Sequence, residues 1–261
     1  MIYVLRSELG KMSSIASTYW NAFAAVLVSV ALGAMGAASM LVAWEEASLA
    51  DRARIESTFT PASYSLLGIG FGLCAVLVFS VLTITSEYGT GQIRSTLAAV
   101  PNRAVLLTSK ALTVFLAGTV TGLVMGVAGF VVGQLVLSTH DLETTITAPG
   151  VLVGLVRGAV AVGLAGVAAF AVGSLVRNTP AAIMVVLAIF YLPMFLVPML
   201  PDQVGDKLDY LPSMLTIGAA APQSEVRPDT VVGPLPSLGL MVAWAVVPLA
   251  IAMVVNQRRD A

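Results

Sequence analysis

Long apolar stretches without charges, separated by shorter polar segments, form the main pattern along this chain of 261 residues. A helix needs about 20 residues to cross the roughly 30 Å hydrocarbon core of a bilayer. The pattern predicts an all-α membrane protein with a single transmembrane domain spanning residues 1–261. We expect six membrane-spanning helices, at about residues 20–42, 64–85, 105–137, 158–176, 181–200 and 235–255.

The composition agrees with this prediction. Hydrophobic residues make up 58% of the chain and charged residues 10%, and the mean hydropathy is +0.94. Soluble proteins average about 45–50% apolar and about 25% charged residues. The first apolar stretch is longer than the core of a cleavable signal peptide, and a polar segment with Arg6, Glu8 and Lys11 precedes it. We therefore expect the first stretch to be a membrane span.

The segment before the first span, residues 1–19, has an amphipathic pattern. Apolar residues recur at three- and four-residue spacings, and the basic residues lie elsewhere on the helical wheel. This pattern predicts a helix lying in the membrane interface; a plain cytoplasmic extension of the first span is the alternative. The apolar residues of the stripe are Ile2, Leu5, Leu9, Met12 and Ile15.

The longest non-spanning segment, residues 201–234, is rich in Pro and Asp. It contains the apolar piece LPSMLTIGAAA at 211–221, which is too short to span a bilayer. We expect a short re-entrant or interfacial helix on the outer side before the sixth span, with an ordered loop as the alternative.

The distribution of basic residues predicts the orientation. If the N-terminus faces the cytoplasm, eight of the 13 Lys and Arg residues lie inside. Cytoplasmic loops carry an excess of such residues, so both termini are expected in the cytoplasm. The inside set is Arg6, Lys11, Arg94, Arg103, Lys110, Arg177, Arg258 and Arg259, and the outside set is Arg52, Arg54, Arg157, Lys207 and Arg227.

A charged elbow at residues 86–104 separates the second and third spans. It lies within the sequence TSEYGTGQIRSTLAAVPNRAVLLTSK, residues 85–110. Gly89 and Gly91 let the backbone leave the second span, and Pro101 stops a short helical pattern that contains Ile93 and Leu97. The pattern predicts a short amphipathic helix at the cytoplasmic membrane surface. The alternative is a solvated connecting loop.

The ordered residues of this elbow resemble the segment after the second span in permease subunits of the ATP-binding-cassette (ABC) type-2 family, which are mostly bacterial exporters. The amphipathic N-terminal segment, six spans, cytoplasmic termini and apolar insertion before the last span resemble that family too. The residues that carry the resemblance are Glu87, Tyr88, Gly89, Thr90, Arg94, Leu97, Pro101, Arg103, Leu107 and Lys110.

The resemblance implies that the elbow is a coupling helix that docks on a separate nucleotide-binding ATPase subunit. Ile93 and Leu97 would anchor it, Arg94 or Arg103 would pair with acidic groups of the partner, and Glu87 would pair with a nearby basic residue or cap a backbone turn. The full set of expected coupling residues is Glu87, Gly89, Thr90, Ile93, Arg94, Leu97, Pro101 and Arg103.

The same resemblance implies two permease chains, identical or paralogous, with two ATPase subunits that hold ATP and magnesium, in a bacterial cytoplasmic membrane. The chain itself has no G-x-x-x-x-G-K-[ST] phosphate-binding loop, because Met12 follows its only Gly-Lys pair, Gly10-Lys11. We therefore expect a transport subunit rather than an enzyme, with no cofactor of its own and no nucleic acid as a partner.

Few polar groups are expected inside the membrane. Arg157 either snorkels at the outer interface or, if the fourth span begins near residue 150, lies roughly 10 Å deep and can contact an anionic or headgroup-bearing substrate. Phe190, Tyr191 and Phe195 either line a path for an apolar substrate or face lipid. Such an interior suits an amphipathic or lipid-like substrate, such as a drug, a peptide antibiotic, a lipid or a polymer.

Glycines at four-residue spacing, among them Gly118, Gly122 and Gly126, predict surfaces where helices pack closely. Other enzyme classes lack the necessary residues: His140, the only histidine, has no second histidine for a metalloprotease motif. A membrane scaffold or immunity-type protein without transport, and a self-contained channel or facilitator, are the alternative functions.

Overall fold

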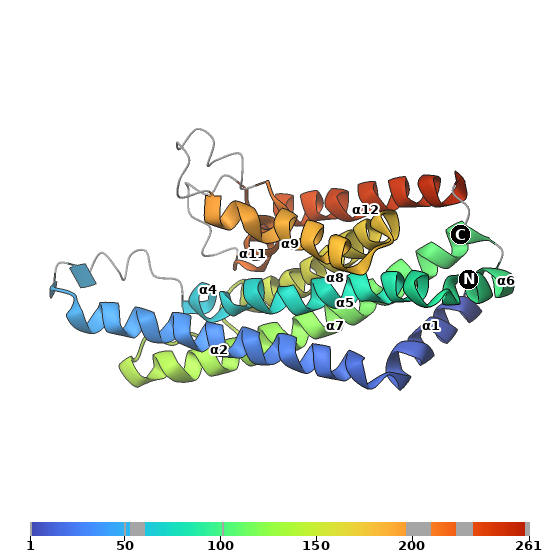
Figure 1. Cartoon of the computed structure of the whole chain (residues 1–261). Coiled ribbons are helices and arrows are strands. Elements are labelled where there is room, and N and C mark those ends of the chain that lie inside the picture. Colours follow the sequence, from blue (N-terminus) through green and yellow to red (C-terminus); the bar gives the residue numbers. More distant parts are fainter. Residues whose placement is uncertain are drawn as a thin grey trace.

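The computed structural model describes residues 2–49, 51–52, 61–100, 102–196, 210–222 and 232–258, and this part of the chain is helical with short connections (Figure 1). Pro101 and the expected outer-side residues Arg54, Lys207 and Arg227 lie outside the described residues. The helices are α1 (Ile2–Ser14), α2 (Ala16–Glu46), α4 (Pro61–Leu66), α5 (Gly68–Thr90), α6 (Gln92–Ala99), α7 (Arg103–Leu137), η1 (Ser138–His140), α8 (Val151–Val176), α9 (Thr179–Leu196), α11 (Pro212–Ala220) and α12 (Pro234–Arg258).

Within the described residues, five helical segments are long and apolar enough to cross a bilayer. They are Ala16–Glu46, Pro61–Thr90, Arg103–His140, Val151–Val176 and Pro234–Arg258, with mean hydropathy from 2.1 to 2.5 over their most apolar windows. Helix α9 contains a sixth, shorter apolar stretch, Thr179–Pro193. The long helices run side by side as an elongated bundle (Figure 1).

Two of the observed helices have other ends than the expected spans. The second expected span is divided at Leu67 into α4 and α5. The fourth was expected at 158–176, but α8 begins at Val151, because Val151, Leu152 and Val153 continue the apolar helix on the N-terminal side of Arg157. The expected short helix at 211–221 is present as α11.

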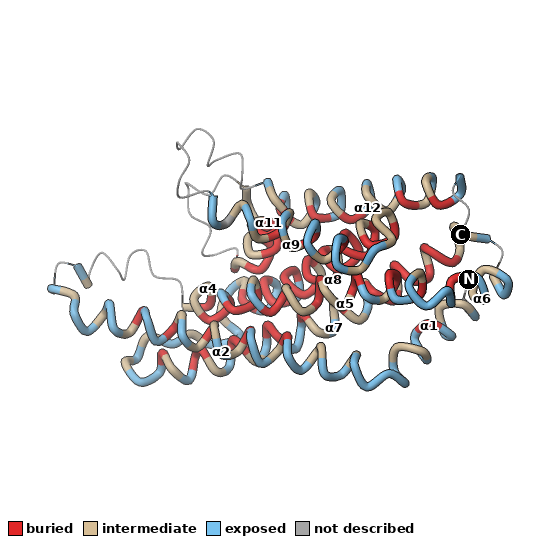
Figure 2. The backbone as a smooth tube through the Cα atoms, viewed as in Figure 1, coloured by how far each residue is buried: buried red, intermediate tan, exposed pale blue. Residues whose placement is uncertain are grey.

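Helix α8 forms the centre of the bundle. It packs against α5, α7, α11 and α12, and 72% of its most apolar window is buried (Figure 2). Small residues allow neighbouring helices to pack closely against α8. A Cβ atom added to Gly118 of α7 would lie only 3.1 Å from the Cα atom of Gly163 in α8. Gly122 and Gly126 also face α8, so the spaced glycines of α7 lie at a close helix contact, as their spacing predicts.

Helix α2 also approaches α4 and α5 closely. A Cβ atom on Gly68 of α5 would lie 1.8 Å from the backbone oxygen of Ser29 in α2, and one on Gly33 of α2 would lie 2.6 Å from the backbone oxygen of Ser65 in α4. Any larger residue at these positions would collide with backbone. Both contacts of α2 therefore depend on glycine.

Helix α1 is separate from α2, because Ile15 adopts an extended conformation between them. The face of α1 turned to the bundle differs from the expected apolar stripe: Glu8 is buried and Lys11 is half-buried, whereas Leu9 and Ile15 are exposed. Charges on this helix are thus directed toward the bundle, for the reason described below.

Candidate functional site

Helix α6 lies at the end of the bundle where α1 and α12 also have their chain-terminal ends (Figure 1). Gly91 ends α5 in the left-handed conformation with φ of 72°, which turns the chain into α6. At the other end, the side chain of Asn102 accepts a hydrogen bond of 3.1 Å from the backbone nitrogen of Val105 and so caps α7. The elbow therefore has defined turns at both ends.

One face of α6 anchors it and the other is exposed. Ile93 is buried in an apolar cluster with residues of α5 and α7, including Ile84 and Leu107, and half-buried Leu97 packs against the same cluster. Arg94 is exposed on the opposite side. Gly89 and Thr90, at the end of α5, are exposed as well. The helix thus presents a polar surface while Ile93 and Leu97 fix its position.

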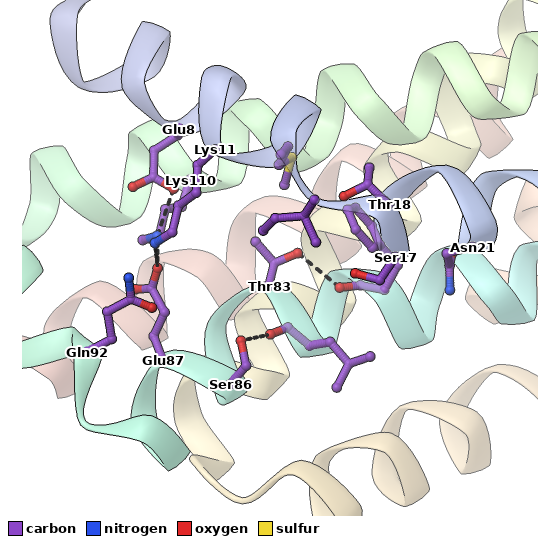
Figure 3. Close-up of a pocket in the computed structure, with 14 residues that line it drawn as sticks. Glu8, Lys11, Ser17, Thr18, Asn21, Thr83, Ser86, Glu87, Gln92 and Lys110 are labelled. Carbon is purple, nitrogen blue, oxygen red and sulfur yellow. Dashed lines mark hydrogen bonds and ion pairs between the residues drawn. The ribbon is translucent and has the colours of Figure 1, made fainter.

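Behind α6, four charged side chains form a network that joins α1, α5 and α7 (Figure 3). The ammonium group of Lys110 lies 2.7 Å from Oε2 of Glu8 and 2.8 Å from Oε1 of Glu87. Lys11 pairs with the same Oε1 atom of Glu87. Two positive and two negative charges balance, so the network carries no net charge.

This network is almost fully shielded from solvent. Lys110 is 1% exposed, Glu87 3% and Glu8 7%, whereas the Lys11 side chain is 34% exposed. Breaking such a buried pair by removing one partner costs about 3–5 kcal/mol, because the other charge remains buried and uncompensated. The four side chains therefore hold α1 against α5 and α7.

The expected pairing of Glu87 with a nearby basic residue is present, but its full set of partners was missed. The sequence indicates Lys110 as a cytoplasmic basic residue that is part of the family resemblance, and it places Lys11 away from the apolar stripe of an interfacial helix; it does not indicate that both bond Glu87. The sequence does contain opposite charges that could pair. Glu8 and Lys11 are three residues apart, about one turn of a helix, and Glu87 and Lys110 lie near the two ends of the elbow.

A second polar cluster lies at the same end of the bundle and is centred on Asn256 of α12. Its side-chain oxygen accepts hydrogen bonds from Arg177 (2.6 Å) and Tyr88 (3.0 Å), and its backbone oxygen accepts one from Arg103 (2.6 Å). The guanidinium of Arg177 also lies over the Tyr88 ring, 4.9 Å from its centre. Arg103 is thus directed toward α12, so Arg94 is the better fit to the expectation that Arg94 or Arg103 pairs with acidic groups of a partner.

Arg157 is buried, which agrees with the second of the two expectations, a fourth span that begins near residue 150, and not with snorkelling at the interface. It is the seventh residue of α8, roughly 9 Å along the helix at 1.5 Å per residue, and is 6% exposed. Its Nη2 atom donates to the backbone oxygen of Ala221, 2.7 Å away at the end of α11, while its Nε atom has no partner among the described residues. The guanidinium therefore fastens α11 to α8.

The three aromatic residues of α9 do not share one surface. Phe190 is buried in the main core, Phe195 is 69% exposed, and the hydroxyl of Tyr191 donates to the backbone oxygen of Gly70, 2.7 Å away. Tyr191 lines a small cavity of about 50 Å³ beside Ile217. The three side chains therefore do not form a joint lining for a substrate path.

Five long apolar helices, with many large apolar side chains exposed on their outer surfaces, define a multi-pass helical membrane protein. Comparison with known proteins found no family model that matches the chain and no curated protein that matches it.

Proposed function

We propose that the chain is the membrane-spanning permease subunit of an ABC type-2 exporter in a bacterial cytoplasmic membrane. The observation that carries this proposal is α6, a short surface helix anchored by Ile93 with Arg94 exposed, directly in front of a buried charge network that joins α1, α5 and α7. An element built this way can receive a force at the surface and pass it to three helices.

The proposal includes six membrane crossings, and the connections between the helices support it. Helix α8 is followed by Arg177, which bonds Asn256 near the end of α12. If α8 and α12 both end at one membrane surface, the chain between them has to return to the other surface. Helix α9 lies in that interval and extends roughly 27 Å over 18 residues, so in this proposal it is the fifth crossing. Six crossings would put both chain ends on one side, and the distribution of basic residues supports the cytoplasm as that side.

The proposed mechanism is a shift between two conformations. Two ATPase subunits, holding ATP and magnesium, dock on the α6 helices of two permease chains and move them together when they close on ATP. Because Glu87 and Lys110 join the ends of α5 and α7, both helices move with α6 and favour the outward-open state. The cargo would be an amphipathic or lipid-like molecule exported from the cytoplasm or inner leaflet.

Reversing the charge of Arg94 tests the docking surface. The full chain and its Arg94→Glu variant are purified from the native membranes, and Mg-ATP hydrolysis by co-purifying subunits is measured. The matched control is Arg6→Glu, the same charge change at an exposed position of α1. Arg103 is unsuitable because it bonds the backbone of Asn256.

We expect wild type and Arg6→Glu to retain an ATPase subunit and Arg94→Glu to lose it. Equal retention by all three would show that α6 is not the docking surface. No ATPase with any of them would favour a membrane scaffold, and substrate flux without ATP would favour a self-contained facilitator.

A further inference from the structure

A cavity of about 380 Å³ lies between α1, the beginning of α2 and the end of α5 (Figure 3). This volume is many times what one bridging water needs. Charged groups of the network, Glu87 and Lys11 among them, form one wall, and Ser17, Thr18 and Asn21 add further polar groups. Apolar side chains form the rest of the lining, namely Met12, Ile15, Phe79 and Leu82. The lining therefore fits a molecule with a polar head and an apolar body.

One acceptor in this wall is unused. Both lysines bond Oε1 of Glu87, and Oε2 of the same carboxylate is buried without a hydrogen-bond partner in the described part of the chain. A buried acceptor left without a partner costs about 1–3 kcal/mol. Gln92, an exposed side chain, lies beside the carboxylate, so a ligand reaches Oε2 by displacing it (Figure 3). The position calls for a hydrogen-bond donor.

The charges around the cavity define what kind of donor fits. Glu8, Glu87, Lys11 and Lys110 sum to zero, so a ligand with a large net charge gains little there. Lys11 uses one of its three N–H donors on Glu87 and is partly exposed, which leaves it able to bind an anionic oxygen. A zwitterion with an ammonium group and a phosphate, held close together, satisfies both positions.

The surroundings place the cavity at the depth of lipid headgroups. Tyr19 and Trp20, next to the lining residues of α2, are 61% and 70% exposed. Exposed Tyr and Trp side chains gather at membrane–water interfaces. The apolar lining residues Ile15 and Leu82 are 44% and 38% exposed, so the apolar side of the cavity opens toward lipid.

We propose that this cavity binds a phospholipid whose headgroup carries a primary ammonium, of the phosphatidylethanolamine type, from the leaflet on the side of the chain ends. The ammonium donates to Oε2 of Glu87 and the phosphate accepts from Lys11. Phosphatidylcholine has the same charges but no N–H group, so it cannot satisfy Glu87. The site does not depend on the proposed transport function.

The test compares lipids retained by the purified full chain. Protein is reconstituted in nanodiscs of equal phosphatidylethanolamine and phosphatidylcholine, extracted in mild detergent, and its bound lipids are quantified by mass spectrometry. We expect about tenfold enrichment of phosphatidylethanolamine, the factor that corresponds to about 1.4 kcal/mol, one modest charge-assisted hydrogen bond.

Two variants link the enrichment to the cavity. Thr83→Leu places a larger, apolar side chain in the cavity, one helical turn from Glu87. Its control is Thr108→Leu on α7, outside this lining; both hydroxyls donate to a backbone oxygen of their own helix, at 2.9 and 2.8 Å. Glu87→Gln replaces the unused acceptor. Enrichment should be lost in Thr83→Leu and Glu87→Gln and kept in Thr108→Leu. No enrichment in wild type, or equal enrichment in all four proteins, would overturn the proposal and leave the cavity to water.

Discussion

Replacing Lys110 by methionine should strongly destabilise the protein. Lys110 is 1% exposed and bonds both Glu8 and Glu87, so its removal leaves Glu8 without a partner in the network and one net negative charge in a buried place. A cost of about 3–5 kcal/mol is expected. At about 2–4 °C per kcal/mol for a chain of this size, the unfolding temperature should fall by roughly 6–20 °C.

A double-mutant cycle separates charge imbalance from lost packing. Adding Glu8→Gln to Lys110→Met leaves Glu87 paired with Lys11, so the network is neutral again and part of the lost stability should return. Lys11→Met is the comparison, because the Lys11 side chain is 34% exposed and partly screened by solvent. Its effect should be smaller than that of Lys110→Met.

The assay is thermal unfolding of the detergent-solubilised chain, followed by tryptophan fluorescence and by the loss of the monodisperse peak in size-exclusion chromatography. A double variant that loses the sum of the two single losses would refute the reasoning, since it would mean that Glu8 and Lys110 stabilise the fold independently.

Three further outcomes follow from other contacts. Gly68→Ala should prevent normal assembly of α2 and α5, because its Cβ atom would lie 1.8 Å from the backbone oxygen of Ser29. Its control is Gly239→Ala, whose Cβ atom would have nothing within 4 Å. In the same unfolding assay this control should be neutral or stabilise the protein by up to about 1 kcal/mol. Asn256→Ala should cost about 1.5–3 kcal/mol, because Arg177 loses a hydrogen bond, while Asn256→Asp should keep that bond; a larger loss in Asp than in Ala would contradict this. Gly163→Ala should separate α7 from α8, since its Cβ atom would lie 2.7 Å from the backbone oxygen of Phe115, and cysteine crosslinking across the two helices should then fall.

The apolar helices could be predicted from the sequence because membrane spans need long uncharged runs, and those runs are visible without any knowledge of packing. The elbow was also readable, since Gly91 and Asn102 act locally on the backbone. Such features depend on neighbours in the chain, which a sequence displays directly.

The partners of the charged residues could not be predicted in the same way. Glu8 and Lys110 are 102 residues apart, and a helical wheel of α1 alone gives no reason to turn Glu8 inward. The sequence leaves two depths open for Arg157 for a related reason: the backbone oxygen that accepts its hydrogen bond lies 64 residues further along the chain. Contacts of this kind become visible only when the helices are assembled.

The bond between Arg157 and Ala221 has a consequence for biosynthesis. A ribosome adds about 5–20 residues per second, so the 64 residues between the two take roughly 3–13 s to synthesise. During that interval α8 is already made, while the helix end whose backbone oxygen accepts the hydrogen bond from its guanidinium does not yet exist. The arginine then has to rely on water, lipid phosphates or the insertion machinery. Arrival of α11 ends this dependence, which makes its docking a late step in membrane assembly.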